Sequence, residues 1–225
     1  MTAPIIGIDG YPRGWVAARI DDDVLTWSTC AVDAVADLLD PKAVTAIDMP
    51  IGLADTGWRA CDIAAKTQLG HASSRVFMTP PRSVLELGFG APNQVVQDLS
   101  RELTGQGTSR QAMALAERIL ALDAAVESRQ SGRGTVLEVH PELSFAQMAG
   151  RVLASKKSAR GVAERLDALT TWRPSVLHEI AHAPADVPVD DALDALACAW
   201  SAQRWLTGAA ETLPSGSTEP PFIAF

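Results

Sequence analysis

The N-terminal segment constrains the fold most, because it alternates short apolar runs with tight polar turns. Residues 5–10 are apolar and β-branched, as expected of a buried strand. Residues 11–14 then follow a turn pattern, with proline at the second position and glycine at the fourth. Two further strands are predicted at residues 15–20 and 24–30, joined by a short aspartate-rich connection. Three strands with such short links predict an antiparallel meander.

The next segment predicts a change of direction in the sheet. Residues 32–39 have helical spacing and stop at Asp40-Pro41. Residues 43–47 form another short apolar run, which ends on Asp48. A strand reached through a helical crossover usually runs parallel to an earlier strand. We therefore expect this fourth strand to extend the sheet as a parallel neighbour.

The rest of the chain is predicted to be mainly helical, with one more strand. Residues 49–93 are rich in Pro, Gly, Ser and Arg, and residues 73–83 within them are either a binding loop or an insertion. Helices are predicted at residues 57–69, 108–129, 158–169, 175–181 and 189–207, with another beginning at residue 141, and a fifth strand at 135–139. These elements predict an α/β fold: a mixed five-stranded sheet flanked by helices. We expect a single domain over residues 1–225, with a helical and loop insertion at about residues 55–130.

The charge and cysteine content limit the classes of partner and compartment. The formal net charge is −8, with 27 acidic and 19 basic residues, so the overall field opposes a polyanion, although a basic patch or metal ions can still bind nucleic acid. The 3 cysteines are far apart and lack CxxC spacing, which favours free thiols over disulfides or structural zinc. No apolar run approaches the roughly 20 residues that span a bilayer. We expect a cytoplasmic protein with no membrane segment.

Aspartates at the ends of apolar segments are the strongest functional signal. Asp9 ends the first apolar run and Asp48 ends the fourth, while Asp191 and Asp194 share one face of a late apolar helix. Clustered carboxylates are costly to bury unless a cation neutralises them. Mg²⁺ and Mn²⁺ prefer oxygen ligands of this kind. A single aspartate after a strand commonly caps a turn, and one on a helix commonly faces water, but Asp9, Asp48 and Asp194 together favour a metal site.

Five more polar residues are candidates for the same site. Glu138 lies in the fifth predicted strand, where a glutamate is rarely buried unless paired. His140 either orients water or phosphate, or is simply hydrogen-bonded within the fold. Arg82, Lys156 and Lys157 are candidate cations for a phosphate-bearing substrate. For the two lysines, a solvated helix N-terminus fits the sequence equally well.

Several blocks of sequence resemble a known family. The blocks are GIDGYPRGWVAA, AIDMPIGL, RVFMTPPR, EVHPELSFAQMAG with the SKKSARG that follows it, and DDALDALACAW. In order and wording they are similar to domain-of-unknown-function family 429, whose members are predicted to be ribonuclease H-like nucleases. The strand order and the late D-x-x-D-A-L-A helix also resemble the ribonuclease H-like superfamily, and that helix most resembles the one in Holliday-junction resolvases.

The resemblance implies a metal-dependent nuclease or phosphodiesterase acting on a nucleic acid or a nucleotide. Asp9, Asp48 and Asp194 would hold Mg²⁺ or Mn²⁺, and Asp191 occupies the position one turn before the last ligand. Glu138 is the remaining candidate for the catalytic set. One position departs from the pattern, because many ribonuclease H-like nucleases have glutamate where this chain has the shorter Asp48.

Two other functions stay open at the level of sequence. Sugar-kinase and actin-like ATPases share the first strands of this fold, which allows a phosphotransfer or nucleotide-binding protein. Their glycine-rich phosphate hairpin is replaced here by Tyr11-Pro12, however, and proline lacks the N–H that such a hairpin needs. The chain is also too short for their two lobes. The third possibility is a degenerate nuclease fold that only binds a protein partner.

Overall fold

A mixed five-stranded sheet forms the centre of the computed structural model, which describes residues 3–128 and 135–225. The strands lie in the order β3-β2-β1-β4-β5. Their bounds are β1 Ile5–Tyr11, β2 Gly14–Asp21, β3 Val24–Cys30, β4 Val44–Ile47 and β5 Thr135–Glu138. The first three strands are antiparallel, whereas β4 pairs in parallel with β1, and β5 in parallel with β4. The predicted α/β class, meander and parallel additions are confirmed.

The parallel register brings the ends of three strands to one edge of the sheet. Ile8 in β1 is paired with Ile47 in β4, and Ile47 in turn with Glu138 in β5. Asp9 and Asp48 each follow these paired positions directly. Parallel strands have their carboxyl ends at the same edge. Segments far apart in the sequence therefore deliver Asp9 and Asp48 side by side.

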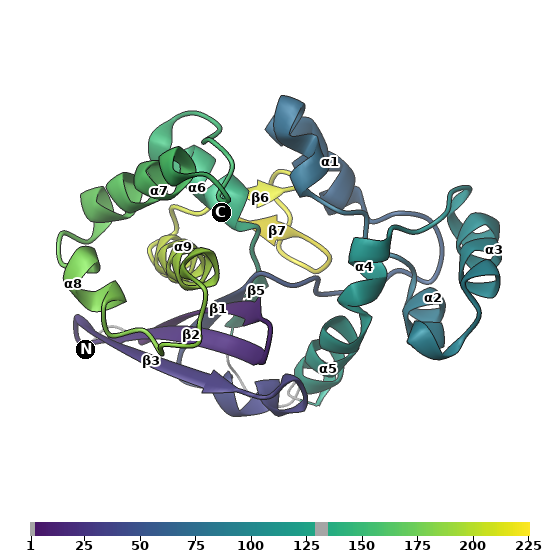
Figure 1. Ribbon diagram of the computed structural model, residues 1–225, viewed down its shortest axis with the longest axis horizontal. Helices are drawn as coiled ribbons and strands as arrows, with labels where there is room; N and C mark the ends of the chain where they lie inside the picture. The colour runs from purple at the N-terminus through teal and green to yellow at the C-terminus, as the bar shows by residue number, and fades with distance from the viewer. Residues whose placement is uncertain (1–2, 129–134) are drawn as a thin grey trace.

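One face of the sheet is covered by the late helices, α9 foremost. The helices are α6 Pro141–Ala149, α7 Ala159–Trp172, α8 Val176–Ile180 and α9 Val189–Leu206, and Figure 1 shows them gathered on one side of the strands. Gly7 in β1 allows α9 to approach closely, because a Cβ at this position would lie 2.0 Å from the carbonyl oxygen of Ala195. Side chains alternate along a strand, so Asp9 points to the same face as Gly7. The fold thus places Asp9 under the helix that carries Asp194.

The other face of the sheet packs on a 3₁₀ helix and on α5. These are η1 Val32–Leu38 and α5 Ala116–Glu127. Ile6 and Ile8, which alternate with Gly7 and Asp9, belong to the same buried cluster as Ile119 and Leu122 of α5. Strand β1 is therefore buried on both faces, which explains why it reads as a nearly continuous apolar run.

The segment between β4 and α5 consists of short helices that extend to one side of the sheet (Figure 1). They are α1 Ala60–Leu69, η2 Gly70–Arg75, α2 Arg82–Leu87, η3 Gly88–Gly90, α3 Asn93–Thr104 and α4 Arg110–Ala114. A C-terminal hairpin of β6 Thr212–Leu213 and β7 Ile223–Ala224 lies beside β5, where Ala224 bridges to Val139. Within residues 3–128 and 135–225, no helix is long and apolar enough to cross a bilayer.

The helices of this segment differ from the sequence-based expectation in two places. Helix α3 was not predicted, although Pro92 precedes it and Gly105 ends it with a φ of 78°, which are ordinary start and stop signals. The predicted helix over residues 108–129 is two helices that meet at Leu115. Ser109 rather than Thr108 caps the first of them, its hydroxyl accepting a hydrogen bond from the Ala112 N–H. The predicted end at residue 129 and the insertion boundary at 130 lie outside the described residues.

Candidate metal centre

Three aspartates from three elements converge at the carboxyl edge of the sheet. Asp9 comes from β1, Asp48 directly follows β4 and Asp194 lies in α9. One carboxylate oxygen from each lies within 4.8 Å of those of the other two. The structure therefore brings together the three residues that the sequence singled out as metal ligands. Asp48 reaches the cluster despite its shorter side chain.

The three carboxylates are in an environment that disfavours negative charge. Asp9 is 6% exposed and Asp194 is 2% exposed. Burial, and then the charges of Asp48 and Asp194, hold the pKa of Asp9 well above its usual value. Burial likewise raises the pKa values of Asp48 and Asp194, and the nearby Lys156 opposes both shifts. A cation would relieve the repulsion that this arrangement creates.

The three aspartate oxygens lie close enough together to hold one cation. Carboxylate oxygens of this kind are ligands that Mg²⁺ prefers. In addition, Oδ1 of Asp194 is buried and has no hydrogen-bond partner in the protein. A buried carboxylate oxygen without a partner has its lone pairs available for a ligand.

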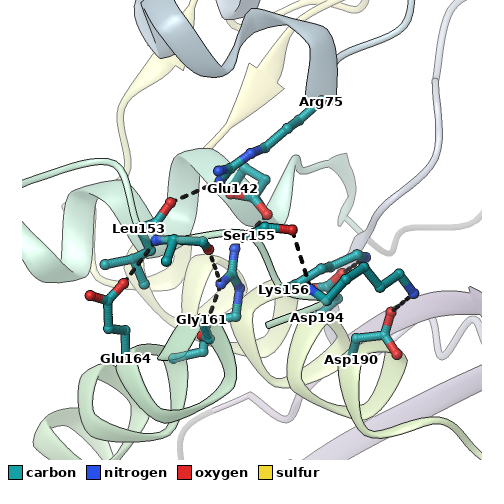
Figure 2. A network of polar contacts seen from close by, with 12 residues as sticks. Arg75, Glu142, Leu153, Ser155, Lys156, Gly161, Glu164, Asp190 and Asp194 are labelled. Carbon is teal, nitrogen blue, oxygen red and sulfur yellow. Dashed lines mark hydrogen bonds and ion pairs between the residues drawn. The ribbon is translucent and has the colours of Figure 1, made fainter. Parts of the chain in front are cut away.

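The connection between α6 and α7 places Lys156 beside Asp194 (Figure 2). Lys156 forms an ion pair with Asp194, and Lys157 pairs with Asp190 at 2.5 Å. Among the charges near Asp194, that of Lys156 opposes the rise in its pKa most strongly. Its own pKa is raised, since the attraction of Asp194 and Asp9 outweighs its burial. In this structure Lys156 supplies the positive charge that the three aspartates require.

Asp191, the fourth aspartate candidate, lies at the border of the cluster. It lines the same cavity as Asp9, Asp48 and Asp194. Burial and the charge of Asp190 raise its pKa to about 6, although Lys156 opposes the shift. The i, i+3 spacing in α9 therefore puts Asp191 and Asp194 on one face, as predicted.

Glu138 lines the cavity but is held in a separate buried ion-pair network. The Arg59 guanidinium, 2% exposed as a residue, donates to Glu138 at 2.5 and 2.8 Å and to Asp62 at 2.5 Å. Glu138 also accepts a 2.7 Å hydrogen bond from the Ile51 N–H, in the loop after Asp48. Burial raises the pKa of Glu138 to about 7 against the opposing charge of Arg59. Its carboxylate is thus occupied in fixing the loop that carries Asp48.

Other polar candidates are distributed around the cavity. His140 lines it, and its buried Nδ1 has no partner in the protein. Burial lowers the pKa of His140, which favours the neutral ring. Glu142 also lines the cavity and is paired with Arg75 at 2.6 Å and with the fully buried Arg165 at 2.5 Å (Figure 2 shows Arg75 and Glu142).

Arg82 was expected at the phosphate of a substrate, but it has another role in the structure. It begins α2 and forms ion pairs with Asp123 and Glu127 of α5. It is not among the described residues that line the cavity. Helix α2 packs on α5, and Arg82 links these two helices through its ion pairs.

The carboxylates open into a cavity of about 350 Å³. The segment between β4 and α5 contributes Phe77, Thr79, Gln111 and Leu115 to its lining.

A model of one protein family matches the chain over residues 7–219. The protein belongs to this family, described as Protein of unknown function (DUF429). Searches of curated proteins and of solved structures give no match.

In this family 429 protein, sequence reasoning missed the ion-pair network around Arg59. Arg59 and Asp62 are three residues apart at the start of α1, a spacing that alone predicts a surface pair. Their burial depends on Glu138, 79 residues from Arg59 along the chain. The one available signal was Glu138 itself, a glutamate in a strand predicted to be central, which requires a partner.

Proposed function

We propose that this protein is a metal-dependent phosphodiesterase with a ribonuclease H-like fold. The observation that carries the proposal is the convergence of Asp9, Asp48 and Asp194, whose oxygens lie within 4.8 Å of one another. These residues would hold Mg²⁺ or Mn²⁺. The order β3-β2-β1-β4-β5, with aspartates within β1, directly after β4 and on α9, supports the superfamily assignment.

The bound metal would supply a Lewis acid that activates water and stabilises charge at phosphorus. The chain's own residues would do the positioning. Asp194 and Lys156 already form an ion pair, so a cation at the three aspartates would compete with Lys156 for Asp194. Lys156 also lines the cavity and would contact a phosphate oxygen as a point charge. Asp191 lies on the same helix face and would orient water at the border of the site.

Hydrolysis of bis(p-nitrophenyl) phosphate tests the proposal, with Mn²⁺ or Mg²⁺ added to protein stripped of metal. Wild-type protein should release p-nitrophenol only with metal. Asp48→Asn should lower kcat/KM by at least about a hundredfold, the scale on which removing one stabilising group in a preorganised site acts.

Asp123→Asn is the matched control, since Asp123 is 8% exposed and ion-paired, but lies on α5 and pairs with Arg82. It should retain wild-type activity with the same metal requirement. Equal activity of the Asp48 and Asp123 variants would remove the aspartate cluster from the mechanism. Metal binding at the cluster without any hydrolysis would favour a binding protein on this fold.

A further inference from the structure

The cavity that contains the three aspartates has the size of a small-molecule site. Its volume is about 350 Å³. Pockets for small ligands occupy roughly 300–1,000 Å³, so this one is at the lower end. A ligand that fills this cavity is of about the size of a single nucleotide.

The charges around the cavity also oppose a polymer of phosphates. The lining contains seven acidic residues, Asp9, Asp48, Asp62, Glu138, Glu142, Asp191 and Asp194. It contains four basic residues, Arg59, Arg75, Lys156 and Lys157. Each of these four is paired with a carboxylate within the described part of the chain. Nucleic-acid binding depends on cations that neutralise several successive phosphates, whereas a single phosphoester needs only one cation and the metal.

Three buried polar atoms of cavity-lining residues have no partner in the protein. They are Oγ1 of Thr79, Nδ1 of His140 and Oδ1 of Asp194. Thr79 is 1% exposed, so its hydroxyl has been removed from water without a compensating hydrogen bond. Buried polar groups are nearly always paired. Of the eight unpartnered side-chain atoms in the described part of the chain, three belong to residues that line this cavity, where a ligand would complete them. Phe77 adds an aromatic surface to the same lining, suited to stack on a base.

We infer that the substrate is a phosphodiester no larger than a mononucleotide ester, rather than a nucleic-acid strand. The inference rests on the proposed phosphodiesterase function. The phosphate lies at the aspartates and metal, the flat group lies against Phe77, and the polar groups of the ligand bond to Thr79 and His140. The segment that supplies Phe77 and Thr79 forms part of the cavity wall.

A comparison of substrates of different length tests the size limit. The substrates are thymidine 5′-(p-nitrophenyl phosphate) and short single-stranded and duplex oligodeoxynucleotides, each with Mn²⁺. We expect kcat/KM for the small ester to exceed that for either oligonucleotide by at least about tenfold. This factor corresponds to one or two polar contacts that the oligonucleotide would not make in the cavity. A higher kcat/KM for an oligonucleotide would overturn the inference while leaving the phosphodiesterase function intact.

A binding measurement separates the two proposals. Thymidine 5′-monophosphate is titrated calorimetrically with Mn²⁺ into wild-type protein and into Thr79→Val and Thr45→Val. Thr45 is the matched control, since it is also 1% exposed and has an unpartnered Oγ1, but lies in β4 and is not among the residues that line the cavity.

Neither valine variant should be less stable than wild type, because neither hydroxyl has a partner to lose. Thr79→Val should weaken binding by at least about fivefold, since it removes one hydrogen bond to the ligand, whereas Thr45→Val should bind as wild type does. Equal affinities of the two variants, or no binding to wild type, would overturn the inference. Binding that depends on Thr79, with no ester hydrolysed, would support the ligand class and refute only the phosphodiesterase function.

Discussion

At the scale of single residues, the aspartate cluster lowers the stability of the folded protein when it is ionised, and the same negative charge would attract a cation. Asp9, Asp48 and Asp194 all have pKa values raised by burial in the folded protein. Their unfolded values lie near 3.8. A carboxyl that is harder to ionise in the folded state favours folding while protonated and opposes it once ionised. The cluster is therefore a strained feature in the absence of metal.

This strain predicts a pH dependence with a definite sign. Between pH 4 and the raised pKa values, roughly pH 7 for Asp48, the folded state binds more protons than the unfolded state. The contribution of the cluster to the free energy of unfolding is thus fully present below the unfolded pKa and falls as pH rises. Denaturant unfolding in EDTA at pH 5 and pH 8 should show a smaller decrease for Asp48→Asn than for wild type. Asp123→Asn is the control, and a decrease as large in Asp48→Asn as in wild type would contradict the assignment.

At the scale of elements, the α6–α7 connection is built to hold two lysines at different depths. Its end is fixed because Ser158 caps α7, its hydroxyl accepting a hydrogen bond from the Gly161 N–H. The Lys156 side chain is 31% exposed and pairs with the nearly buried Asp194, whereas the Lys157 side chain is 75% exposed. Pairs of exposed charges contribute little, whereas removing one partner of a buried pair leaves the other charge uncompensated. The two neighbouring lysines should therefore have different effects on the metal site.

Replacing each lysine by methionine tests this difference. Lys156→Met removes a positive charge that competes with metal for Asp194, so Mn²⁺ should bind at least about tenfold more tightly. Lys157→Met should change the affinity by less than about threefold, because the Lys157 side chain is 75% exposed and pairs with Asp190, which is not one of the three aspartates. Isothermal titration with Mn²⁺ measures both. Weaker binding in Lys156→Met would mean that Lys156 supports the metal site rather than competing for it.

Local sequence pattern predicted the elements whose signals are themselves local. The meander was predictable because β1 to β3 are short runs joined by tight turns, and α9 because its apolar spacing continues over many turns. Asp9, Asp48 and Asp194 could be chosen because each is a charge at the end of, or within, an apolar element. The network of Arg59 and Glu138 could not be predicted, since the buried contact joins residues 79 positions apart. The ion pair of Arg82 with Asp123 could not be predicted for the same reason, because Asp123 lies on a helix that only the fold brings near.

At the scale of the whole molecule, the sheet with α9 and the segment between β4 and α5 contribute different features of the site. The sheet and α9 bring the three aspartates together, and Gly7 allows this by letting α9 lie directly on β1. The segment between β4 and α5 adds Phe77, Thr79 and Gln111 to the cavity wall. The first part accounts for the proposed chemistry and the second for the proposed substrate size. The proposed chemistry therefore depends most on whether a metal binds at the aspartates.

Anomalous diffraction from crystals grown with Mn²⁺ measures this most directly. We expect a manganese peak coordinated by Asp9, Asp48 and Asp194. The structure offers one internal comparison, because Cys61, Asp62 and Glu138 also place potential ligand atoms within 4.8 Å of one another. Arg59 already neutralises that second group, so it should stay without metal. A peak only at the second group, or no peak at the three aspartates at saturating Mn²⁺, would contradict the central claim.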